Sequence, residues 1–300
     1  MTFPQFRAEV NRIIVYLPRV PSDQRRQALQ QELEKLPAGD ARETALTLVA
    51  AAVELGATPH EPDHIVVLIH GIRTHATWAE MVGAVLVQDT GAKVVPLRYD
   101  FFDLLSFLCP FRTRRAPVAR LLRELRDLRT QNPTARISAV AHSFGTYALT
   151  KALEEPDIRL HRVIFCGCIV KNTFRRARHE AQLGKDPILN DCGTHDVLPV
   201  LAKSVTWGYG ASGTFGFGTV GVRDRFSKFG HSGCFDQAFV QKYWAPFIRD
   251  GTITGTDWER TRTTPPYWLS LLSWFPLRWL LLVLLAAAAA FVALRLLPHS

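Results

Sequence analysis

The segment Ile137-Ser-Ala-Val-Ala-His-Ser-Phe-Gly-Thr-Tyr147 decides the fold class of this 300-residue chain. An apolar, β-compatible run ends in a small-x-Ser-x-Gly turn and continues directly into a helix-compatible sequence. Ala141 and Gly145 stand two residues on either side of Ser143, and small residues there permit a strained strand-to-helix turn. Such a turn lifts the serine hydroxyl clear of the sheet and places it at a helix N-terminus. The pattern predicts a nucleophile elbow with Ser143 as the nucleophile.

A serine nucleophile requires a histidine base, an acid that orients the histidine, and hydrogen-bond donors for the oxyanion. Residues 65–73 form an apolar strand that ends in His-Gly, which suits an oxyanion-donor loop. We expect the backbone N–H groups of Ile72 and Phe144 to be the two donors. Downstream, residues 190–199 contain aspartates after another strand, and a later glycine-flanked loop contains His231.

Two aspartates compete for the role of the acid. Asp191 sits at the expected strand end, where a carboxylate often only caps a turn, whereas Asp196 lies in the loop beyond it, shortly before Pro199. We favour Asp196. His231 is favoured as the base because it alone follows both serine and acid and precedes a helix-compatible segment; the other histidines weighed are His142, His161, His179 and His195. His142, inside the elbow, is interpreted as a residue that packs against the turn.

With these motifs the chain resembles the α/β-hydrolase superfamily, and within it the lipase-like serine esterases related to membrane-associated lipid and GPI-inositol deacylases. The resemblance covers roughly residues 63 to 250, and Ala141 departs from it by replacing the first glycine of the elbow. Alanine is small enough for the turn. The resemblance implies acyl transfer to water, with Ser143, Asp196 and His231 as the catalytic residues. It implies no metal and no organic cofactor.

From residue 65 onward apolar strands alternate with helices, which predicts a mostly parallel sheet covered on both faces. The predicted strands are residues 65–69, 93–97, 137–140, 162–165 and 188–190. The connection before the last of these is only about twenty residues long, which predicts an uncapped site open to a bulky or membrane-presented substrate. We assign residues 61–252 to this α/β-hydrolase catalytic domain.

Residues 1–60 read as an N-terminal segment of three short helices without a catalytic pattern. Ser22 is expected to cap the second helix; Asp40 with Glu43 is expected to open the third, which Gly56 closes. Two interpretations stay open for this segment. It is either a packed embellishment of the hydrolase or a helical module that binds a protein partner.

The composition is basic, with 36 Lys and Arg against 27 Asp and Glu, a formal net charge of +9 and a pI of about 9.6. A basic surface attracts nucleic acid or anionic lipid. No nucleic-acid-binding motif accompanies it, so we expect no nucleic-acid partner. The five cysteines form an odd set without metal-ligand spacing, which favours a reducing compartment.

The last residues indicate where the protein works. Residues 279–294 carry no charge, and with the leucines that follow they approach the ~20 residues needed to span a bilayer. We therefore expect a transmembrane helix at residues 277–297, preceded by a linker and interfacial segment at residues 253–276. More arginines precede the uncharged run at residues 279–294 than the single Arg295 after it, so the positive-inside rule keeps the catalytic domain on the cytoplasmic side.

Two segments are expected to wall the site. Residues 100–111 are mostly apolar and are interpreted as a buried helix or an acyl-binding flap. Residues 206–219 alternate glycine with aromatics and are interpreted as a mobile loop over the pocket.

Two functions remain in view: a membrane-anchored serine esterase acting on lipid or other acyl esters, or a membrane-tethered interaction protein on a hydrolase scaffold that acts through its N-terminal helices.

Overall fold

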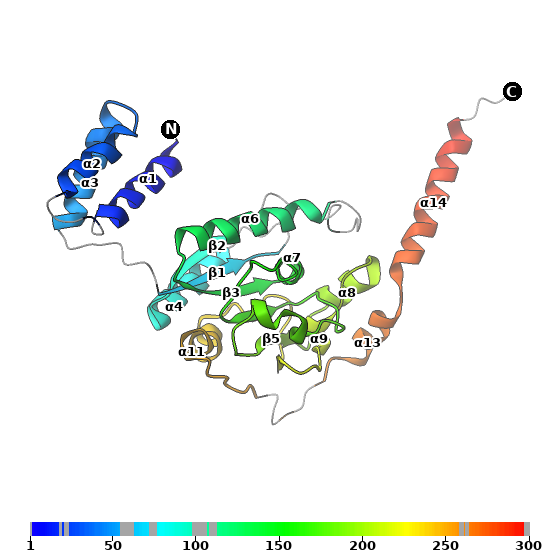
Figure 1. The fold of residues 1–300 in the computed structure, drawn as a ribbon. Coiled ribbons are helices and arrows are strands. Elements are labelled where there is room, and N and C mark those ends of the chain that lie inside the picture. Colours follow the sequence, from blue (N-terminus) through cyan, green and yellow to red (C-terminus); the bar gives the residue numbers. More distant parts are fainter. Residues whose placement is uncertain are drawn as a thin grey trace. The chain divides into compact units, whose positions relative to one another are not determined.

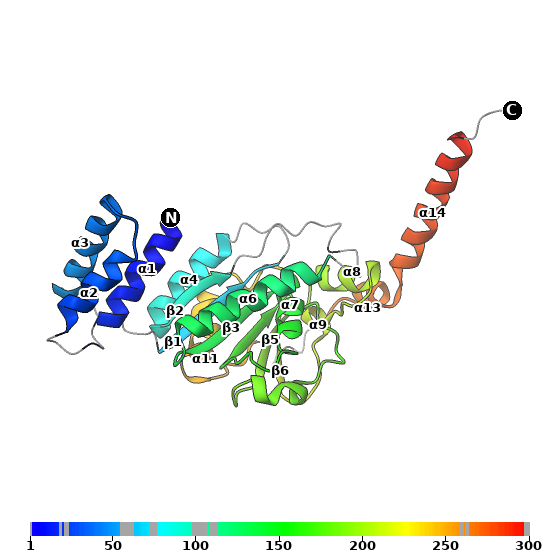
Figure 2. The ribbon, with the colours of Figure 1, turned by 45° about the horizontal axis from the view of Figure 1, so that its top comes forward.

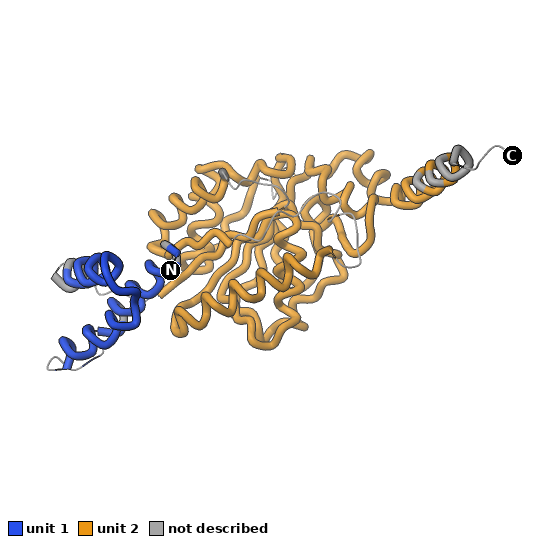
Figure 3. The backbone as a smooth tube through the Cα atoms, turned by 90° about the horizontal axis from the view of Figure 1, so that it is seen from above, with its two compact units in different colours: residues 1–61 blue, residues 62–300 orange. Residues whose placement is uncertain are grey.

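The computed structural model describes residues 2–17, 20, 24–54, 63–71, 77–97, 107, 113–257, 261 and 264–296. The chain divides into two compact units, Met1–Glu61 and Pro62–Ser300, which Figure 3 draws in different colours. Each unit encloses apolar clusters of its own. A separate core is what a unit needs in order to fold independently.

The described part of the first unit forms three helices, α1 (Phe3–Tyr16), α2 (Arg25–Glu34) and α3 (Asp40–Glu54). The three predicted helices are therefore confirmed. All three contribute to one core, which includes Val10, Ile13, Ala28 and Val49. α3 begins at Asp40 with Glu43 in its first turn, where carboxylates are favoured by the helix dipole. The expected caps Ser22 and Gly56 lie outside the described residues.

A parallel sheet of six strands, in the order β2-β1-β3-β4-β5-β6, organises the second unit. The strands are β1 (His64–Ile69), β2 (Lys93–Leu97), β3 (Arg136–His142), β4 (Val163–Cys166), β5 (Ile188–Gly193) and β6 (Val222–Ser227). Since all of them run the same way, their carboxyl ends meet at one edge, where Ala141 pairs with Ile69 and His142 with Cys166. Ligand sites of open α/β sheets lie at this edge.

Alternate strand residues face two different cores, as expected for a parallel sheet buried on both faces. In β1, Ile65, Val67 and Ile69 join one core, and Val66 and Leu68 join the other. The first core is completed by α6 (Arg115–Gln131) and α7 (Phe144–Ala152). The second is completed by α4 (Thr77–Thr90), the π-helical turn η3 (Val240–Trp244) and α11 (Ala245–Asp250). Figures 1 and 2 show α6 and α7 on one face of the sheet and α4 and α11 on the other. The predicted α/β layering is confirmed.

The strand β6 is missing from the sequence prediction because Val-Arg-Asp-Arg-Phe-Ser reads as charged and exposed. A buried ion pair brings it into the sheet: Arg225 Nε and Nη2 donate to the Asp191 carboxylate at 2.6 and 2.8 Å. Trp244 Nε1 donates to the same carboxylate at 2.7 Å. Asp191 is fully buried within β5, which continues to Gly193. The expectations that the strand stops at residue 190 and that Asp191 caps a turn are therefore wrong.

The segment at residues 206–219, interpreted from the sequence as a mobile loop over the pocket, is mostly buried in the unit. It contains the short helix α9 (Ser212–Phe215). The amides of Gly210 and Gly213 donate to the carbonyls of Ile169 and Cys168, each at 2.7 Å. A Cβ on Gly213 would lie 2.2 Å from the Cys168 backbone nitrogen, so the glycines serve close packing.

The four cysteines in the described part of the chain are all buried in the second unit. Cys166, Cys168, Cys192 and Cys234 are buried free thiols, and burial raises the pKa of Cys168 to about 11. A buried protonated thiol is unreactive.

Of the apolar segment at residues 100–111, only Phe107 is described; it is buried and stacks on Tyr209. The choice between helix and flap for that segment lies outside the described residues.

Two helices close the chain, α13 (Tyr267–Trp274) and α14 (Leu277–Leu296). α13 packs on α8 (Leu198–Val205), where Leu269 is fully buried in a cluster with Val200. Ser204 Oγ donates to the Leu272 carbonyl at 2.8 Å. Part of the segment predicted as a linker and interfacial helix is therefore an integral element of the second unit.

Within the described residues, no single helix satisfies the length and hydropathy criteria for crossing a membrane. Tyr267–Trp274 and Leu277–Ala288 satisfy them together, across a bend of 53°. Most described side chains of α14 are exposed, including Trp279, Leu282 and Leu284.

Candidate active site

Ser143 stands between β3 and α7 with φ 54° and ψ −122°, and it is the one non-glycine residue with positive φ in the described chain. Such a backbone costs an L-residue about 1–3 kcal/mol and persists where the surrounding structure fixes it. Here the Ser143 amide donates to the Cys166 carbonyl at 3.1 Å, and the Ser143 carbonyl accepts from the Thr146 hydroxyl at 2.6 Å. The strained strand-to-helix turn expected from the sequence is present.

Two glycines make room for this turn. A Cβ on Gly145 would lie 2.6 Å from the Ile69 carbonyl oxygen, and a Cβ on Gly71 would lie 2.8 Å from Ser143 Cβ and 3.2 Å from its Oγ. The His-Gly end of β1 therefore passes directly against the serine. Phe144 is the buried first residue of α7, so its amide lies at the N-terminal end of that helix. Ile72, the other predicted oxyanion donor, lies outside the described residues.

Asp196 and His231 form a hydrogen-bonded pair. His231 Nδ1 lies 2.9 Å from Asp196 Oδ2 and 3.1 Å from Oδ1, and the carboxylate is almost fully buried. Leu198 N donates to Asp196 Oδ1 at 3.1 Å, and Thr214 Oγ1 donates to the Asp196 carbonyl at 2.7 Å, so the acid is held on both sides. Because a carboxylate only accepts, Nδ1 carries the imidazole proton and Nε2 is the basic nitrogen.

The loops after β5 and β6 are locked together. Thr194 N donates to the Ser227 carbonyl at 2.9 Å, and His195 N donates to the Phe229 carbonyl at 3.1 Å. A Cβ on Gly193 would lie 2.6 Å from that Phe229 oxygen, so only glycine allows this approach. The acid loop and the base loop are therefore fixed by β6, the strand that the sequence did not reveal.

His231 also lies against the end of β4. A Cβ on Gly167, whose φ is 53°, would lie 2.7 Å from His231 Cε1 and 2.9 Å from Nδ1. The preceding residue, Cys166, is the one whose carbonyl accepts from the Ser143 amide. Ser143 and His231 thus both contact residues 166–167, and the structure brings Ser143, Asp196 and His231 to one edge of the sheet.

His142 has a role that the sequence interpretation understated. Its Nε2 lies 3.1 Å from the His231 carbonyl oxygen, and since a carbonyl only accepts, Nε2 must donate. Burial, and then the charge of His231, lower the pKa of His142 to about 3, so it stays neutral at physiological pH. The two imidazole rings are 4.5 Å apart. His142 therefore orients the base loop as well as packing against the turn.

Replacing His142 tests this positioning role. We expect His142→Leu to lower kcat for a soluble p-nitrophenyl ester about tenfold, because losing one buried hydrogen bond of roughly 1.4 kcal/mol frees the His231 backbone. His142→Gln, whose amide can donate to the same carbonyl, should retain most of the activity. Equal losses in the two variants would show that the ring only fills space.

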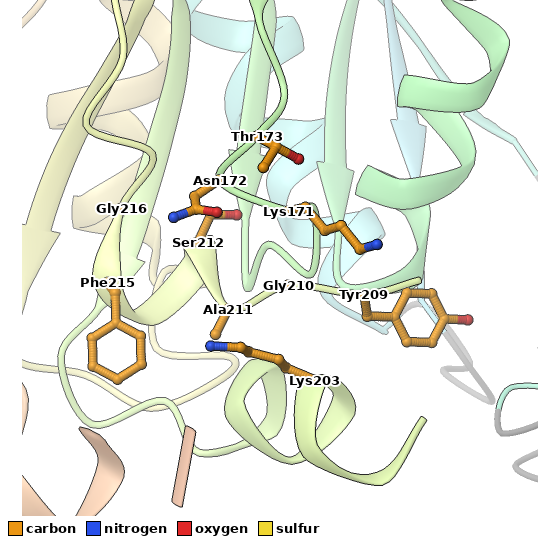
Figure 4. Close-up of a pocket in the computed structure, with 10 residues that line it drawn as sticks. All are labelled: Lys171, Asn172, Thr173, Lys203, Tyr209, Gly210, Ala211, Ser212, Phe215 and Gly216. Atoms are coloured by element: carbon orange, nitrogen blue, oxygen red, sulfur yellow. The ribbon is translucent and has the colours of Figure 1, made fainter. Parts of the chain in front are cut away.

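A cavity of about 220 Å³ lies beside residues 209–216, the segment whose Thr214 donates to the Asp196 carbonyl. Figure 4 shows its lining, which comes from the loop after β4, from α8 and from residues 209–216, with Lys171, Lys203, Tyr209 and Phe215 among them. Ser143 is not one of its lining residues. Within the described residues, no group of three or more His, Cys, Asp or Glu side chains is placed to hold a metal ion.

Comparisons with known proteins find no matching family model and no matching curated protein. Among solved structures, a hydrolase assigned to the alpha/beta superfamily from Xanthomonas campestris pv. campestris is 16% identical with a TM-score of 0.40, over 59% of this chain and 94% of the other. A cutinase-like protein from Cryptococcus sp. is 13% identical with a TM-score of 0.37, over 65% and 97%. An acetyl xylan esterase is 11% identical with a TM-score of 0.30, over 62% and 93%. Likenesses this distant carry no inference about activity.

Proposed function

We propose that this chain is a membrane-anchored serine hydrolase of the α/β-hydrolase type that cleaves carboxylic esters. The observation that carries the proposal is the Asp196–His231 pair at 2.9 Å, held at the same sheet edge as a serine in a strained positive-φ turn. A scaffold gains nothing from this combination, because the turn costs backbone energy and the buried carboxylate needs its partner.

The proposed reaction is acyl transfer to water. Ser143 Oγ attacks the ester carbonyl while its proton passes to His231 Nε2, and Asp196 holds the imidazole through Nδ1. The amides of Ile72 and Phe144 stabilise the oxyanion. The same proton then leaves with the alcohol, and His231 activates a water that releases the acid from the acyl-enzyme. No cofactor enters this scheme.

A fluorophosphonate probe tests the proposal on the purified protein. We expect covalent labelling at Ser143, because such probes react with a serine only where a base and an oxyanion site activate it. Absence of labelling would favour the second candidate, a membrane-tethered interaction protein that acts through the helices of residues 1–60. That candidate is supported by the separate core of the first unit and by Leu46 and Leu48, which are about half exposed on α3.

The membrane part of the proposal concerns α14, with the catalytic domain on the cytoplasmic side. The membrane placement of α14 is supported by the uncharged run at residues 279–294 and by the exposure of most described apolar side chains of this helix. Exposed leucines in such number are unfavourable in water and favourable in lipid. A lipid or other acyl ester presented at the bilayer is then the proposed substrate, of the kind cleaved by lipid and GPI-inositol deacylases.

Removing residues 277–300 tests the anchor while keeping α13. We expect the shortened chain to stay in solution and to cleave a dissolved ester normally, because every proposed catalytic residue is retained. Its rate on a vesicle-embedded ester should fall about 10²-fold, since tethering raises the effective concentration at the surface. Flotation with vesicles and the two rates are the measurements.

The matched control removes residues 265–300, and with them Leu269, which is fully buried against α8. Losing a buried leucine costs about 2–5 kcal/mol, so this form should unfold at lower temperature. If the 277–300 deletion still floats with vesicles, α14 is not the anchor. If it loses both activities equally, α14 serves folding.

A further inference from the structure

A second cavity, of about 280 Å³, lies where α13 meets α14. Its wall is formed by the end of α8, the last turn of α13 and the start of α14, including Lys203, Ser273, Trp274, Phe275, Pro276 and Arg278. Lys203 also lines the cavity beside the acid segment. The wall contains two cationic side chains and no acidic one.

The two cationic side chains are Lys203 and Arg278, and the groups that accept hydrogen bonds from them are a hydroxyl and a backbone carbonyl, both neutral. Lys203 Nζ donates to Ser273 Oγ at 2.8 Å, and Arg278 Nη1 donates to the Lys203 carbonyl at 3.2 Å. The guanidinium lies 5.4 Å from the centre of the Trp207 ring, and Arg278 Nε is buried without a hydrogen-bond partner. Neither cation forms an ion pair with a described carboxylate. Burial and the charge of Arg278 lower the pKa of Lys203, which is the sign of two positive groups with no anion between them.

The position of the cavity at the start of α14 indicates which kind of anion would reach Lys203 and Arg278. It lies at the first turn of the twenty-residue helix α14, whose N-terminal dipole favours negative charge. Trp274 at its wall is 90% exposed and Phe275 is 56% exposed, as is Trp279 just beyond. Aromatic side chains of this kind settle at the headgroup level of a bilayer. A group that occupies the cavity would therefore stand at the depth of lipid phosphates.

We propose that Lys203 and Arg278 bind the phosphate of an anionic phospholipid headgroup in this cavity. The proposal rests on the membrane placement of α14 proposed above. A phosphate diester offers acceptor oxygens to both cations, and Arg278 Nε is a donor still without a partner. Phosphatidylglycerol is a suitable probe because it carries one negative charge on such a diester.

The test measures the lipid that stays with the full-length chain after mild detergent extraction from vesicles of equal phosphatidylglycerol and phosphatidylcholine. We expect phosphatidylglycerol to be enriched about tenfold, the contribution of a good charge-assisted contact. The double variant Lys203→Gln with Arg278→Gln should lose the enrichment. The control, Lys151→Gln with Arg249→Gln, removes two exposed positive charges elsewhere and should keep it.

A second variant guards against misfolding. Ser273→Asp places a carboxylate beside Lys203 Nζ, which should neutralise the cations, leave the unfolding temperature at least unchanged, and exclude the lipid. Enrichment that survives in both this variant and the double variant would overturn the proposal. Displacement of the lipid by millimolar inorganic phosphate would overturn it in favour of a free-phosphate site. A chain that associates with no vesicle at all would instead refute the membrane anchor of the proposed function.

Discussion

Ser143→Ala should abolish ester hydrolysis and fluorophosphonate labelling. The expected loss in kcat on a soluble p-nitrophenyl ester is on the order of 10⁶-fold, because the acyl-enzyme cannot form and only binding and the oxyanion donors remain. The substitution removes one hydroxyl from a partly exposed residue and leaves unchanged Gly71 and Gly145, the glycines that make room for the turn. Initial rates and labelling of the purified variant are the measurements.

The fold of this variant should be about as stable as that of the parent chain. Alanine needs the same positive-φ backbone, with φ 54°, so the strain is not relieved, and the Thr146 bonds to the residue 143 carbonyl remain. As a control, Thr173→Val removes a hydroxyl from the wall of the cavity lined by residues 209–216 and should leave labelling intact. Labelling of Ser143→Ala at the parent rate would remove Ser143 as the nucleophile.

The sequence predicts those parts of the site that depend on local backbone chemistry. The elbow follows from Ala141, Ser143 and Gly145, because only small neighbours permit the strained turn. The contact of Asp196 with His231 is consistent with an acid loop after one strand and a base loop after a later one, which meet at the carboxyl edge of a parallel sheet. The elbow needs no knowledge of distant contacts, and the choice of Asp196 and His231 rests on their order along the chain.

The features that the sequence does not predict depend on pairing across the chain. β6 appears polar until Arg225 is placed against Asp191, and the docking of α13 depends on Leu269 finding Val200 on α8. His142 occupies the variable position of the elbow, so no pattern marks its bond to the His231 carbonyl. In each case a contact between residues far apart in the sequence determines the structure, and the local sequence pattern does not predict it.

Asp196→Asn and Asp191→Asn separate catalysis from folding in two neighbouring carboxylates. Asp196→Asn should lower kcat about 10⁴-fold with little change in the unfolding temperature, because the amide stabilises the wrong imidazole tautomer and cannot balance the imidazolium. Asp191→Asn should leave the rate per folded molecule nearly unchanged. Its carboxylate accepts hydrogen bonds from Arg225 and Trp244, whereas His231 Nδ1 lies against Asp196.

The cost of Asp191→Asn should appear in stability. Arg225 is nearly fully buried, with a side chain 3% exposed, and removing its counter-charge leaves a buried cation that costs about 3 kcal/mol or more. For a domain of this size that corresponds to a fall in Tm of roughly 10 °C. Thermal unfolding and kcat measured on both variants decide the matter. A large rate loss in Asp191→Asn at a temperature where it is folded, with Asp196→Asn still active, would exchange the roles of the two residues.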